Sequence, residues 1–442
     1  MPAFSLDDVI HALQRCAVLE QVKTQFTDIV TDTRKIVPGA LFVALKGERF
    51  NGEDFAAQAV EQGAAGVLVG SRYKQQPGEF GATLIKAVAD TQLAYQQLAA
   101  FWRRKFDIPV IAITGSNGKT TTKDMTAAVL SARFPVLKTQ GNFNNEIGMR
   151  GLGQIAALAP FAAPEIGIVT NVGETHIELL GSIENIAKAK GELVEAIPAG
   201  GTVILNNDNP YTAAMKDKAK AGVRIVTFGI DNDADIKAAA LISHAGKTFF
   251  QCRIGREGEQ KQLSIPMLGR HNVSNALAAV AAGHVLGLTA EQIAEGLESL
   301  EMTGMRFECK RIGAYNIIND AYNASPMSME ASLTTLKEIA ADKGKRSIAV
   351  LGDMLELGHV AVPAHQKVGQ QAAAAGVCGL ITLGEMGREI ARGAREAGLE
   401  AVYSFDTHKE AAAKLRELLQ PEDTILFKGS RGMKMETIID LL

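Results

Sequence analysis

Few cysteines, no long apolar run and no excess of charge of one sign characterise this 442-residue sequence. Its four cysteines, Cys16, Cys252, Cys309 and Cys378, show no CxxC spacing, which argues against a zinc site or a disulfide framework. No apolar run approaches the ~20 residues of a membrane span, and the first residues lack a signal-peptide pattern. The 46 basic and 49 acidic residues nearly balance, which excludes a strong positive field for nucleic acid or anionic membranes. We therefore expect a reduced, cytoplasmic protein with neither of these partners.

The composition is that of an ordinary globular protein, with 47% hydrophobic and 21% charged residues. At roughly 150 residues per domain, the length suggests about three domains. Short apolar runs alternate with helical patterns along the chain, which favours an α/β fold with parallel, doubly wound sheets. We expect a small α/β domain at 1–84, a central domain at 85–309 and a third domain at 310–442.

The clearest functional motif is Ile-Ala-Ile-Thr-Gly-Ser-Asn-Gly-Lys-Thr-Thr-Thr at 111–122. A buried strand leads into a glycine-rich turn and then a helix, and the N–H groups of such a turn point at a phosphate. Lys119 is expected to reach the β- and γ-phosphates, and the Thr120 hydroxyl to bind Mg²⁺. Because Ile113 stands where a longer motif would have glycine, this is the short GxxGKT form. The expected nucleotide contacts are Gly115, Ser116, Asn117, Gly118, Lys119, Thr120 and Thr121.

An acid that would complete such a site is hard to find. P-loop nucleotidases also use an acid at the end of a second buried strand to hold Mg²⁺. Between residues 123 and 165 no apolar strand pattern ends in Asp or Glu, and Glu146 is the one acid there in a motif-like setting. This weakens the prediction of an active ATPase and makes Glu146 a candidate metal ligand.

Two further candidates follow the strand expected at 166–172. Glu174 and His176 lie in the loop after that strand, where α/β sheets place ligands, and both could face a metal. In the helix expected at 183–197, the apolar stripe continues onto Lys190, whereas Lys188 falls off it. An inward lysine is costly unless it is paired, neutralised or modified. The alternative is a lysine that follows the edge of the stripe into solvent.

Four more segments place polar groups beside expected strands or helices. Asn272 and Asn275 lie near the start of an Ala-rich helix, where capping alone would explain one of them. Arg306 stands between two domains as either a hinge salt bridge or a phosphate clamp. Segment 317–326 is a strand that feeds a turn rich in Asp, Asn and Tyr, for which a simple capped turn is the alternative. The remaining segments put acids after the strand near 349–352 and cations after the last strand, at 428–431.

These segments together resemble the Mur ligase family of peptidoglycan synthesis, in order and over nearly the whole chain. The nucleotide motif is shared with the wider superfamily, which includes folylpolyglutamate synthetases. Asn-Asp-Ala-Tyr-Asn at 319–323 and Leu-Gly-Asp-Met-Leu-Glu-Leu-Gly at 351–358 are more specific to the branch that adds D-Ala-D-Ala. The other matching segments are 31–34, 41–47, 114–120, His176, 189–190, 269–272, 305–306 and 428–431.

The resemblance implies an ATP-dependent amide ligase with a UDP-sugar domain, a central ATPase domain and a Rossmann-like domain for the amine substrate. A UDP-MurNAc-tripeptide carboxylate would take the γ-phosphoryl group of ATP, and the amine of D-Ala-D-Ala would then displace phosphate. Lys119, Mg²⁺ and Arg306 would stabilise the transferring charge. Asn275 and Asp320 would hold adenine and ribose. We expect a monomer, and the need to order three ligands across three domains predicts an open-to-closed domain motion.

The same resemblance assigns the metal ligands. Thr120 would bind the first Mg²⁺, with Glu146 as a further candidate. In related ligases the lysine matching Lys190 is carbamylated by CO₂ and binds a second Mg²⁺ together with the histidine matching His176. A carbamate would cancel the buried charge and supply the oxygen ligands that Mg²⁺ prefers.

The substrate residues are also implied by the resemblance. Arg34 and the loop near Asn51 would lie near the uridine, and Asn142 and Asn145 near the sugar and the peptide. Whether the tripeptide carries lysine or diaminopimelate is not encoded in these motifs. The expected substrate residues are Thr33, Arg34, Asn51, Asn142, Asn145, Tyr322, Asn323, Asp353, Lys428, Ser430 and Arg431.

One departure from the family lies at the junction of Gly148 and Met149. In the family, a strand with a Mg²⁺-binding Glu at its end stands between the segments that meet here. Either this strand is omitted or the chain has lost a metal ligand. We expect omission, because loss of a central parallel strand would open the sheet, and a Cα separation well above 3.8 Å at this junction would reveal it.

Three rival functions compete with this interpretation. A folylpolyglutamate-synthetase-like ligase would share the ATPase chemistry without needing 351–358. An inactive nucleotide-binding scaffold would explain the missing strand. A GTPase switch is strongly disfavoured, because the chain has no Asn-Lys-x-Asp guanine motif.

Overall fold

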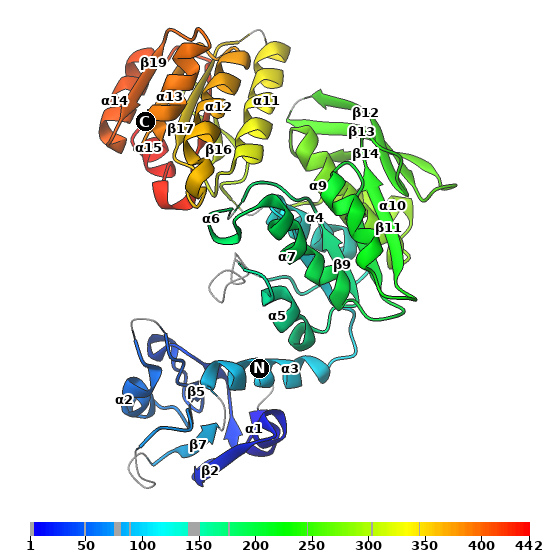
Figure 1. Ribbon diagram of the computed structural model, residues 1–442, viewed down its shortest axis with the longest axis vertical. Coiled ribbons are helices and arrows are strands. Elements are labelled where there is room, and N and C mark those ends of the chain that lie inside the picture. Colours follow the sequence, from blue (N-terminus) through cyan, green and yellow to red (C-terminus); the bar gives the residue numbers. More distant parts are fainter. Residues whose placement is uncertain are drawn as a thin grey trace. The chain divides into compact units, whose positions relative to one another are not determined.

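The computed structural model describes residues 4–47, 50–74, 81–87, 90–139, 151–175, 177–244, 246–301, 304–343 and 345–442 (Figure 1). The chain divides into two compact units, Met1–Pro109 with Leu158–Ala163, and Val110–Ala157 with Pro164–Leu442. The first unit ends at Pro109, whereas the sequence placed a boundary at 84, and the three-domain boundaries stay a prediction. Within the described residues, no helix has both the length and the apolar character needed to cross a membrane.

The first unit contains a five-stranded sheet in the order β2-β7-β6-β5-β4. Strands β4 to β7 pair in parallel and β2 is antiparallel to β7. Ser5 and Asp8 form a capping box at the start of α1, and Asp90 caps α3, so local sequence sets both helix starts. The elements are β1 (Phe4–Ser5), α1 (Leu6–Leu13), β2 (Cys16–Glu20), β3 (Gln25–Phe26), β4 (Ile29–Val30), η1 (Thr33–Lys35), β5 (Leu41–Val43), η2 (Gly52–Phe55), α2 (Ala56–Glu61), β6 (Gly66–Val69), β7 (Thr83–Ala87) and α3 (Thr91–Arg104).

The second unit begins with a seven-stranded sheet in the order β14-β13-β12-β11-β10-β9-β8. Strands β8 to β12 pair in parallel, as expected, whereas β12, β13 and β14 pair antiparallel, which the sequence did not predict. The strands are β8 (Ile111–Thr114), β9 (Ile166–Val169), β10 (Thr202–Asn206), β11 (Arg224–Gly229), β12 (Ile236–His244), β13 (Lys247–Ile254) and β14 (Gln260–Ile265). The helices of this part of the chain are α4 (Lys119–Ser131), α6 (Ile177–Leu180), α7 (Ile183–Ala196), α8 (Pro210–Ala213), η3 (Ala214–Lys218), α9 (Arg270–Val285) and α10 (Ala290–Glu298). Helix α5 (Gln154–Ala162) is divided between the two units, because its residues from Leu158 onward belong to the first.

A six-stranded sheet in the order β15-β16-β20-β17-β18-β19 completes the second unit. Only β15 runs antiparallel to its neighbour. The strands are β15 (Glu308–Ile312), β16 (Tyr315–Asp320), β17 (Ser347–Gly352), β18 (Gly379–Leu383), β19 (Val402–Phe405) and β20 (Thr424–Lys428). The helices are α11 (Pro326–Lys343), η4 (Gly358–Val360), α12 (Ala361–Ala374), α13 (Gly387–Glu396), α14 (His408–Leu418), η5 (Arg431–Met433) and α15 (Glu436–Asp440).

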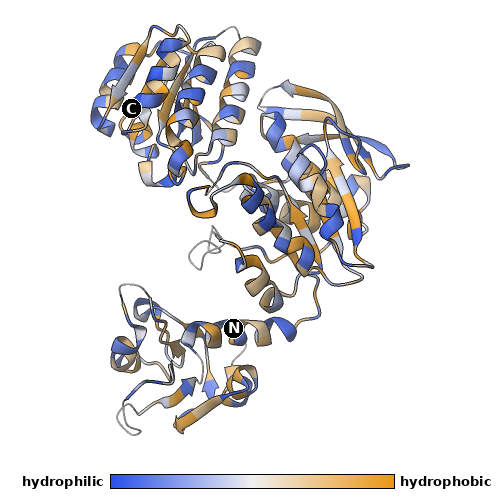
Figure 2. Cartoon of the chain, viewed as in Figure 1, coloured by the Kyte–Doolittle hydropathy of each residue, from blue (hydrophilic) through white to orange (hydrophobic). Residues whose placement is uncertain are grey.

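Helices cover both faces of this last sheet. Along β17, Ile348 and Val350 pack with α14 and α15, whereas Ala349 and Leu351 pack with α11, α12 and α13. Alternate residues of a strand point to opposite faces, so a continuous apolar run is what a doubly covered parallel strand requires. Figure 2 shows these strands as mainly hydrophobic between helices with hydrophilic outer surfaces. The predicted α/β class with separate parallel sheets is confirmed.

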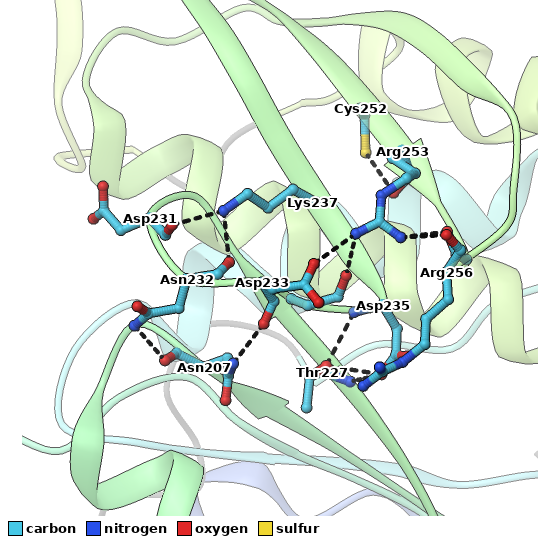
Figure 3. A network of polar contacts seen from close by, with 12 residues as sticks. Asn207, Thr227, Asp231, Asn232, Asp233, Asp235, Lys237, Cys252, Arg253 and Arg256 are labelled. Carbon is cyan, nitrogen blue, oxygen red and sulfur yellow. Dashed lines mark hydrogen bonds and ion pairs between the residues drawn. The ribbon is translucent and has the colours of Figure 1, made fainter.

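A network of polar contacts joins the β11–β12 loop to β11 and β13, next to the strand at which pairing in the central sheet changes from parallel to antiparallel (Figure 3). Asp235 accepts hydrogen bonds from the backbone and hydroxyl of Thr227 and pairs with Arg256 at 2.7 Å. Arg253 of β13 donates to Asp233 and to the carbonyl of Ala234. These contacts tie the β11–β12 loop to β11 and to β13.

Candidate active site

A glycine cradle joins β8 to α4. Gly115 has φ +145° and Gly118 has φ +82°, and Gly118 is the N-cap of α4. A Cβ on Gly115 would lie 1.9 Å from Thr170 Oγ1, and one on Gly118 would lie 2.2 Å from Asn275 Oδ1. Both positions therefore require glycine for backbone conformation and for space. The N-cap Gly118 has no side-chain cap, and the first N–H groups of a helix are the groups that bind an anion in such turns.

The loop after β9 braces this cradle. Ser116 N–H donates to Asn171 O, and Asn117 N–H donates to Asn171 Oδ1, both at 2.9 Å. Thr170 Oγ1 donates to Asn117 O at 2.6 Å, and the Ser116 hydroxyl bonds the backbone of Gly173. This bracing role of Thr170 and Asn171 is not among the roles predicted from the sequence. Their position at the carboxyl end of a parallel strand was the available signal.

Lys119 bends back over the cradle. Its ammonium donates to Gly115 O at 2.7 Å and to Ser116 O at 3.2 Å. Desolvation, followed by the nearby charges of Lys190 and Arg306, lowers the pKa of Lys119 to about 7. Two other cations are therefore close enough to repel it, and a bound polyphosphate would relieve that repulsion.

Lys190 lies on the buried face of α7, as the helical pattern predicts. Its side chain is 5% exposed, whereas Lys188 is exposed, so the alternative of a solvated edge lysine is wrong. Within the described ranges, Lys190 Nζ has no hydrogen bond and no ion pair. Burial lowers its pKa, and the charge of Glu192 opposes that shift. The lowered pKa makes the neutral amine more accessible at neutral pH.

Arg306 connects the cradle helix to the start of the C-terminal sheet. Its Nη2 donates to Thr120 Oγ1 at 2.9 Å, and its guanidinium lies 3.9 Å from the centroid of the Tyr322 ring. Burial lowers the pKa of Arg306, and its Nε is buried without a partner among the described residues. No ion pair to Arg306 is found in the part of the chain that the structure describes.

The two asparagines of α9 are buried close to the cradle. Asn275 Oδ1 accepts from Thr122 Oγ1 at 3.3 Å, and Asn272 Nδ2 donates to Leu268 O at 2.8 Å. The N-cap of α9 is Gly269, without a side-chain cap, so capping explains neither asparagine. Of the remaining predicted nucleotide residues, Thr121 is buried in the first turn of α4.

Asp320, at the end of β16, is held by protein groups. It accepts from Phe307 N, from Ser332 Oγ at 2.7 Å and from Lys428 Nζ at 2.5 Å. Lys428 is 2% exposed and also donates to Asn323 O at 3.1 Å. The lysine predicted as an anion site is therefore already paired inside the chain.

Three other predicted substrate residues gather after β17 and β20. Buried Asp353 accepts from Gly387 N at 2.7 Å at the start of α13, and burial raises its pKa. Ser430 Oγ accepts from Leu355 N at 2.9 Å. Arg431 is exposed and pairs with Glu436 at 2.6 Å. The structure thus brings Asp353 and Ser430 into one loop cluster.

The first unit holds three predicted uridine-side residues. Thr33 and Arg34 lie in η1, where the exposed Arg34 guanidinium pairs with Asp32 at 2.8 Å and lowers the pKa of that carboxyl to about 2. Asn51 caps η2 by accepting from Glu53 N. Four predicted residues, Asn142, Asn145, Glu146 and His176, lie outside the described residues, as does the junction at 148–149.

Metal ligands are sparse in the described part of the chain. No group of three or more His, Cys, Asp or Glu side chains gathers there to hold a metal ion. What gathers at the cradle is a set of three cations, Lys119, Lys190 and Arg306. Such a set favours an anionic ligand, and a metal there would need oxygens from that ligand or from a modified side chain.

Family models match most of the chain. The Mur ligase family catalytic domain matches residues 25–102, the Mur ligase middle domain 113–151 and 143–283, and the Mur ligase glutamate ligase domain 305–431. UDP-N-acetylmuramoyl-tripeptide–D-alanyl-D-alanine ligase of Bacillus subtilis is 39% identical, over 94% of this chain and 93% of that protein. The chain belongs to the Mur ligase family.

Solved structures agree with this Mur ligase assignment. Crystal structure I of MurF from Acinetobacter baumannii has a TM-score of 0.90 at 29% identity, covering 100% of this chain and 99% of that one. MurF ligase of Thermotoga maritima in complex with ADP has a TM-score of 0.82 over 94% and 96% of the two chains; at 23% identity it shows the fold alone.

The family comparison also bears on the departure at 148–149. The B. subtilis alignment spans 439 positions and uses 94% of 442 residues, about 415, so about 24 positions of that relative have no counterpart here. The two matches to the middle domain meet at residues 143–151. Among the described strands, β8 is an edge of its sheet and is only half-buried from Ile111 to Ile113.

Proposed function

We propose that this Mur ligase joins D-alanyl-D-alanine to UDP-N-acetylmuramoyl-tripeptide with consumption of ATP, in cytoplasmic peptidoglycan precursor synthesis. The observation that carries this proposal is the convergence of Lys119, Lys190 and Arg306 at a glycine cradle. The substrates are those in the name of the B. subtilis relative, which is similar over nearly its full length. The T. maritima MurF, which has the same fold, was solved in complex with ADP, and an adenine nucleotide is the ligand that we propose for the cradle.

The reaction needs an activated acid, because a carboxylate is a poor electrophile at neutral pH. The tripeptide carboxylate attacks the γ-phosphorus of ATP, which gives an acyl phosphate and ADP. The amine of D-Ala-D-Ala then attacks the acyl carbon, and inorganic phosphate leaves. Lys119 and Arg306 stabilise the charge on the transferring group. Asn275 and Asp320 hold the adenine and the ribose, and the N–H groups of 115–121 contact the phosphates.

The surroundings of Lys190 fit a carbamate and a divalent metal. A buried amine with a lowered pKa and no partner among the described residues can react with CO₂ in its neutral form. The resulting anion would also balance the charges of Lys119 and Arg306. The Thr120 hydroxyl, the Lys190 carbamate, His176 and Glu146 would hold Mg²⁺, which when bound shields the negative charge of the phosphates.

The other parts of the chain supply the two remaining substrates. Thr33, Arg34 and Asn51 contact the uridine side from a domain at 1–84, and Asn142 and Asn145 the sugar and peptide. The central domain spans 85–309, and a domain at 310–442 receives D-Ala-D-Ala. The protein acts as a monomer whose domains close around the three substrates. The acceptor contacts are Tyr322, Asn323, Asp353, Lys428, Ser430 and Arg431.

The test is phosphate release from ATP with each acceptor omitted in turn. We expect release to require both the UDP-tripeptide and D-Ala-D-Ala, with one phosphate per amide bond formed. Release that ignores D-Ala-D-Ala would overturn the proposal. Turnover with a folate and glutamate would instead establish the folylpolyglutamate alternative, and nucleotide binding without release in any mixture would identify an inactive homologue.

A further inference from the structure

His365, in the first turns of α12, lies completely buried behind the loop that follows β17. Its Nε2 accepts a hydrogen bond from Met354 N–H at 2.9 Å, and its Nδ1 lies 2.6 Å from Ala361 O. An amide N–H can only donate and a carbonyl can only accept. The two partners therefore fix the neutral tautomer with the proton on Nδ1.

The loop bonded by His365 is the one that carries Asp353. On the other side of Met354, Leu355 N–H donates to Ser430 Oγ at 2.9 Å, and Ser430 N–H donates to Asp353 O at 3.0 Å. The Asp353 carboxylate accepts from Gly387 N–H at the start of α13. Three consecutive residues are thus bonded from three directions, and His365 supplies the one contact from α12.

The helix that carries His365 is firmly placed against α13. A Cβ on Gly369 would lie 1.9 Å from Ile390 O, and one on Gly393 would lie 2.0 Å from Gln366 O. The two helix backbones therefore touch one turn beyond His365. Gln366 adds a hydrogen bond to Glu389 at 2.6 Å. This packing leaves the imidazole little freedom to follow a shifted loop.

We propose that His365 is a positioning residue, which sets the backbone of the 353–355 loop so that this loop can bind the D-Ala-D-Ala acceptor. The proposal rests on the function proposed above, because it deepens the role of that loop. Burial lowers the pKa of His365, and the charged groups that face it, Asp353 and Glu389, oppose the shift. A second proton on Nε2 would set an N–H against Met354 N–H and release the loop.

A matched pair of variants separates the two hydrogen bonds. In His365→Gln, the side-chain carbonyl stands near the place of Nε2 and can still accept from Met354 N–H. In His365→Asn, the shorter amide stands near Nδ1, so it keeps the bond to Ala361 O and loses the bond to Met354. His284→Asn, in the last turn of α9, is the control for replacing a partly buried histidine elsewhere.

Steady-state kinetics with each substrate varied gives the readout. We expect His365→Asn to raise the KM for D-Ala-D-Ala by about tenfold, with kcat and the KM for ATP unchanged, and His365→Gln to restore most of this loss. A purely structural role would change all parameters together. An unchanged D-Ala-D-Ala KM in His365→Asn overturns the proposal, whereas a wild type that does not use D-Ala-D-Ala overturns the proposed function instead.

Amide hydrogen exchange in the wild-type enzyme covers the case in which His365→Asn does not fold. We expect Met354 N–H to exchange slowly and to slow further when D-Ala-D-Ala binds to the enzyme with ADP and UDP-tripeptide, a mixture that cannot turn over. ADP alone should have no such effect. Exchange at Met354 that is indifferent to D-Ala-D-Ala would also overturn the positioning role.

Discussion

The two large sheets of the second unit differ in how the buried lysine next to each of them is paired. In the C-terminal sheet, Lys428 is bonded to Asp320 and Asn323. On α7, which packs beside the central sheet, Lys190 is also buried but has no hydrogen bond or ion pair within the described residues, and burial lowers its pKa. A buried charge that is paired within the protein can stabilise a loop. A buried charge without a partner is tolerated where a bound ligand or a covalent modification compensates it. The cradle is therefore where we expect an anionic ligand or a modified lysine.

Among the changes that test this comparison, we expect replacement of Lys190 to have the largest effect, and that effect is on turnover. We expect Lys190→Ala to reduce turnover by about 10³-fold, because charge stabilisation at the phosphoryl group is lost. Added acetate or formate should restore part of the activity by standing in for the carbamate. Lys188→Ala, on the exposed side of the same helix, is the control, and phosphate release is the measurement. Full activity in Lys190→Ala would contradict the carbamate role.

For the free energy of unfolding, we expect the replacement of Lys428 to have the larger effect and the replacement of Lys190 the smaller one. Lys428→Met leaves Asp320 near the protein interior without its cation, and should lower the free energy of unfolding by about 3 kcal/mol. Lys190→Met removes a buried charge that lacks a partner, and should leave that free energy unchanged or raise it. Urea denaturation of both variants measures the difference. Equal destabilisation would show that Lys190 is paired in solution.

The two sheets also differ in the burial of their strands, as the edge strand β8 of the central sheet and the inner strand β17 of the C-terminal sheet show. All six residues of β17 are buried between two neighbouring strands, whereas three of the four residues of β8 are only half-buried. We expect that inserting the corresponding segment of the B. subtilis relative between Gly148 and Met149 stabilises the chain by about 2 kcal/mol through burial of Ile111 and Ile113. Slower amide exchange in β8 would confirm pairing. A Gly/Ser insert of equal length is the control, and equal exchange in both would contradict an omitted strand.

Local pattern was enough to predict much of the fold and part of the site. The strand–glycine–helix order predicted the cradle, and the 3.6-residue period predicted that Lys190 faces inward. The pairing of Lys428 with Asp320 joins residues 108 positions apart, and no local period reports it. The contact of His365 is also not predictable from local pattern. The helical period places His365 on the buried face of its helix, but it does not identify Met354 N–H as its partner. The antiparallel end of the central sheet was missed because apolar alternation does not encode strand direction.

Substitution of Tyr322, which follows β16, tests whether the position of Arg306 at the cradle depends on the C-terminal sheet. Its ring supports the Arg306 guanidinium at 3.9 Å, so Tyr322→Leu should lower kcat by about tenfold through loss of a cation–π contact. Tyr322→Phe keeps the ring and should stay close to the wild type. The measurement is kcat at saturating ATP. If Phe and Leu act alike, the phenol hydroxyl, and not the ring face, is what matters.

A titration at His271 should give the smallest effect. Burial, opposed by Asp320 and assisted by Lys428, lowers the pKa of His271 to about 4. Because the unfolded chain binds the proton near pH 6.5, this group contributes stability above that pH, and the contribution is lost as the pH falls toward 4. We expect the wild type to lose about 1 kcal/mol more unfolding free energy than His271→Gln between pH 7 and pH 5.5. Urea denaturation at both pH values measures the difference. Parallel losses in the two proteins would show that His271 is not held neutral, and that the polar cluster around Asp320 is open to water.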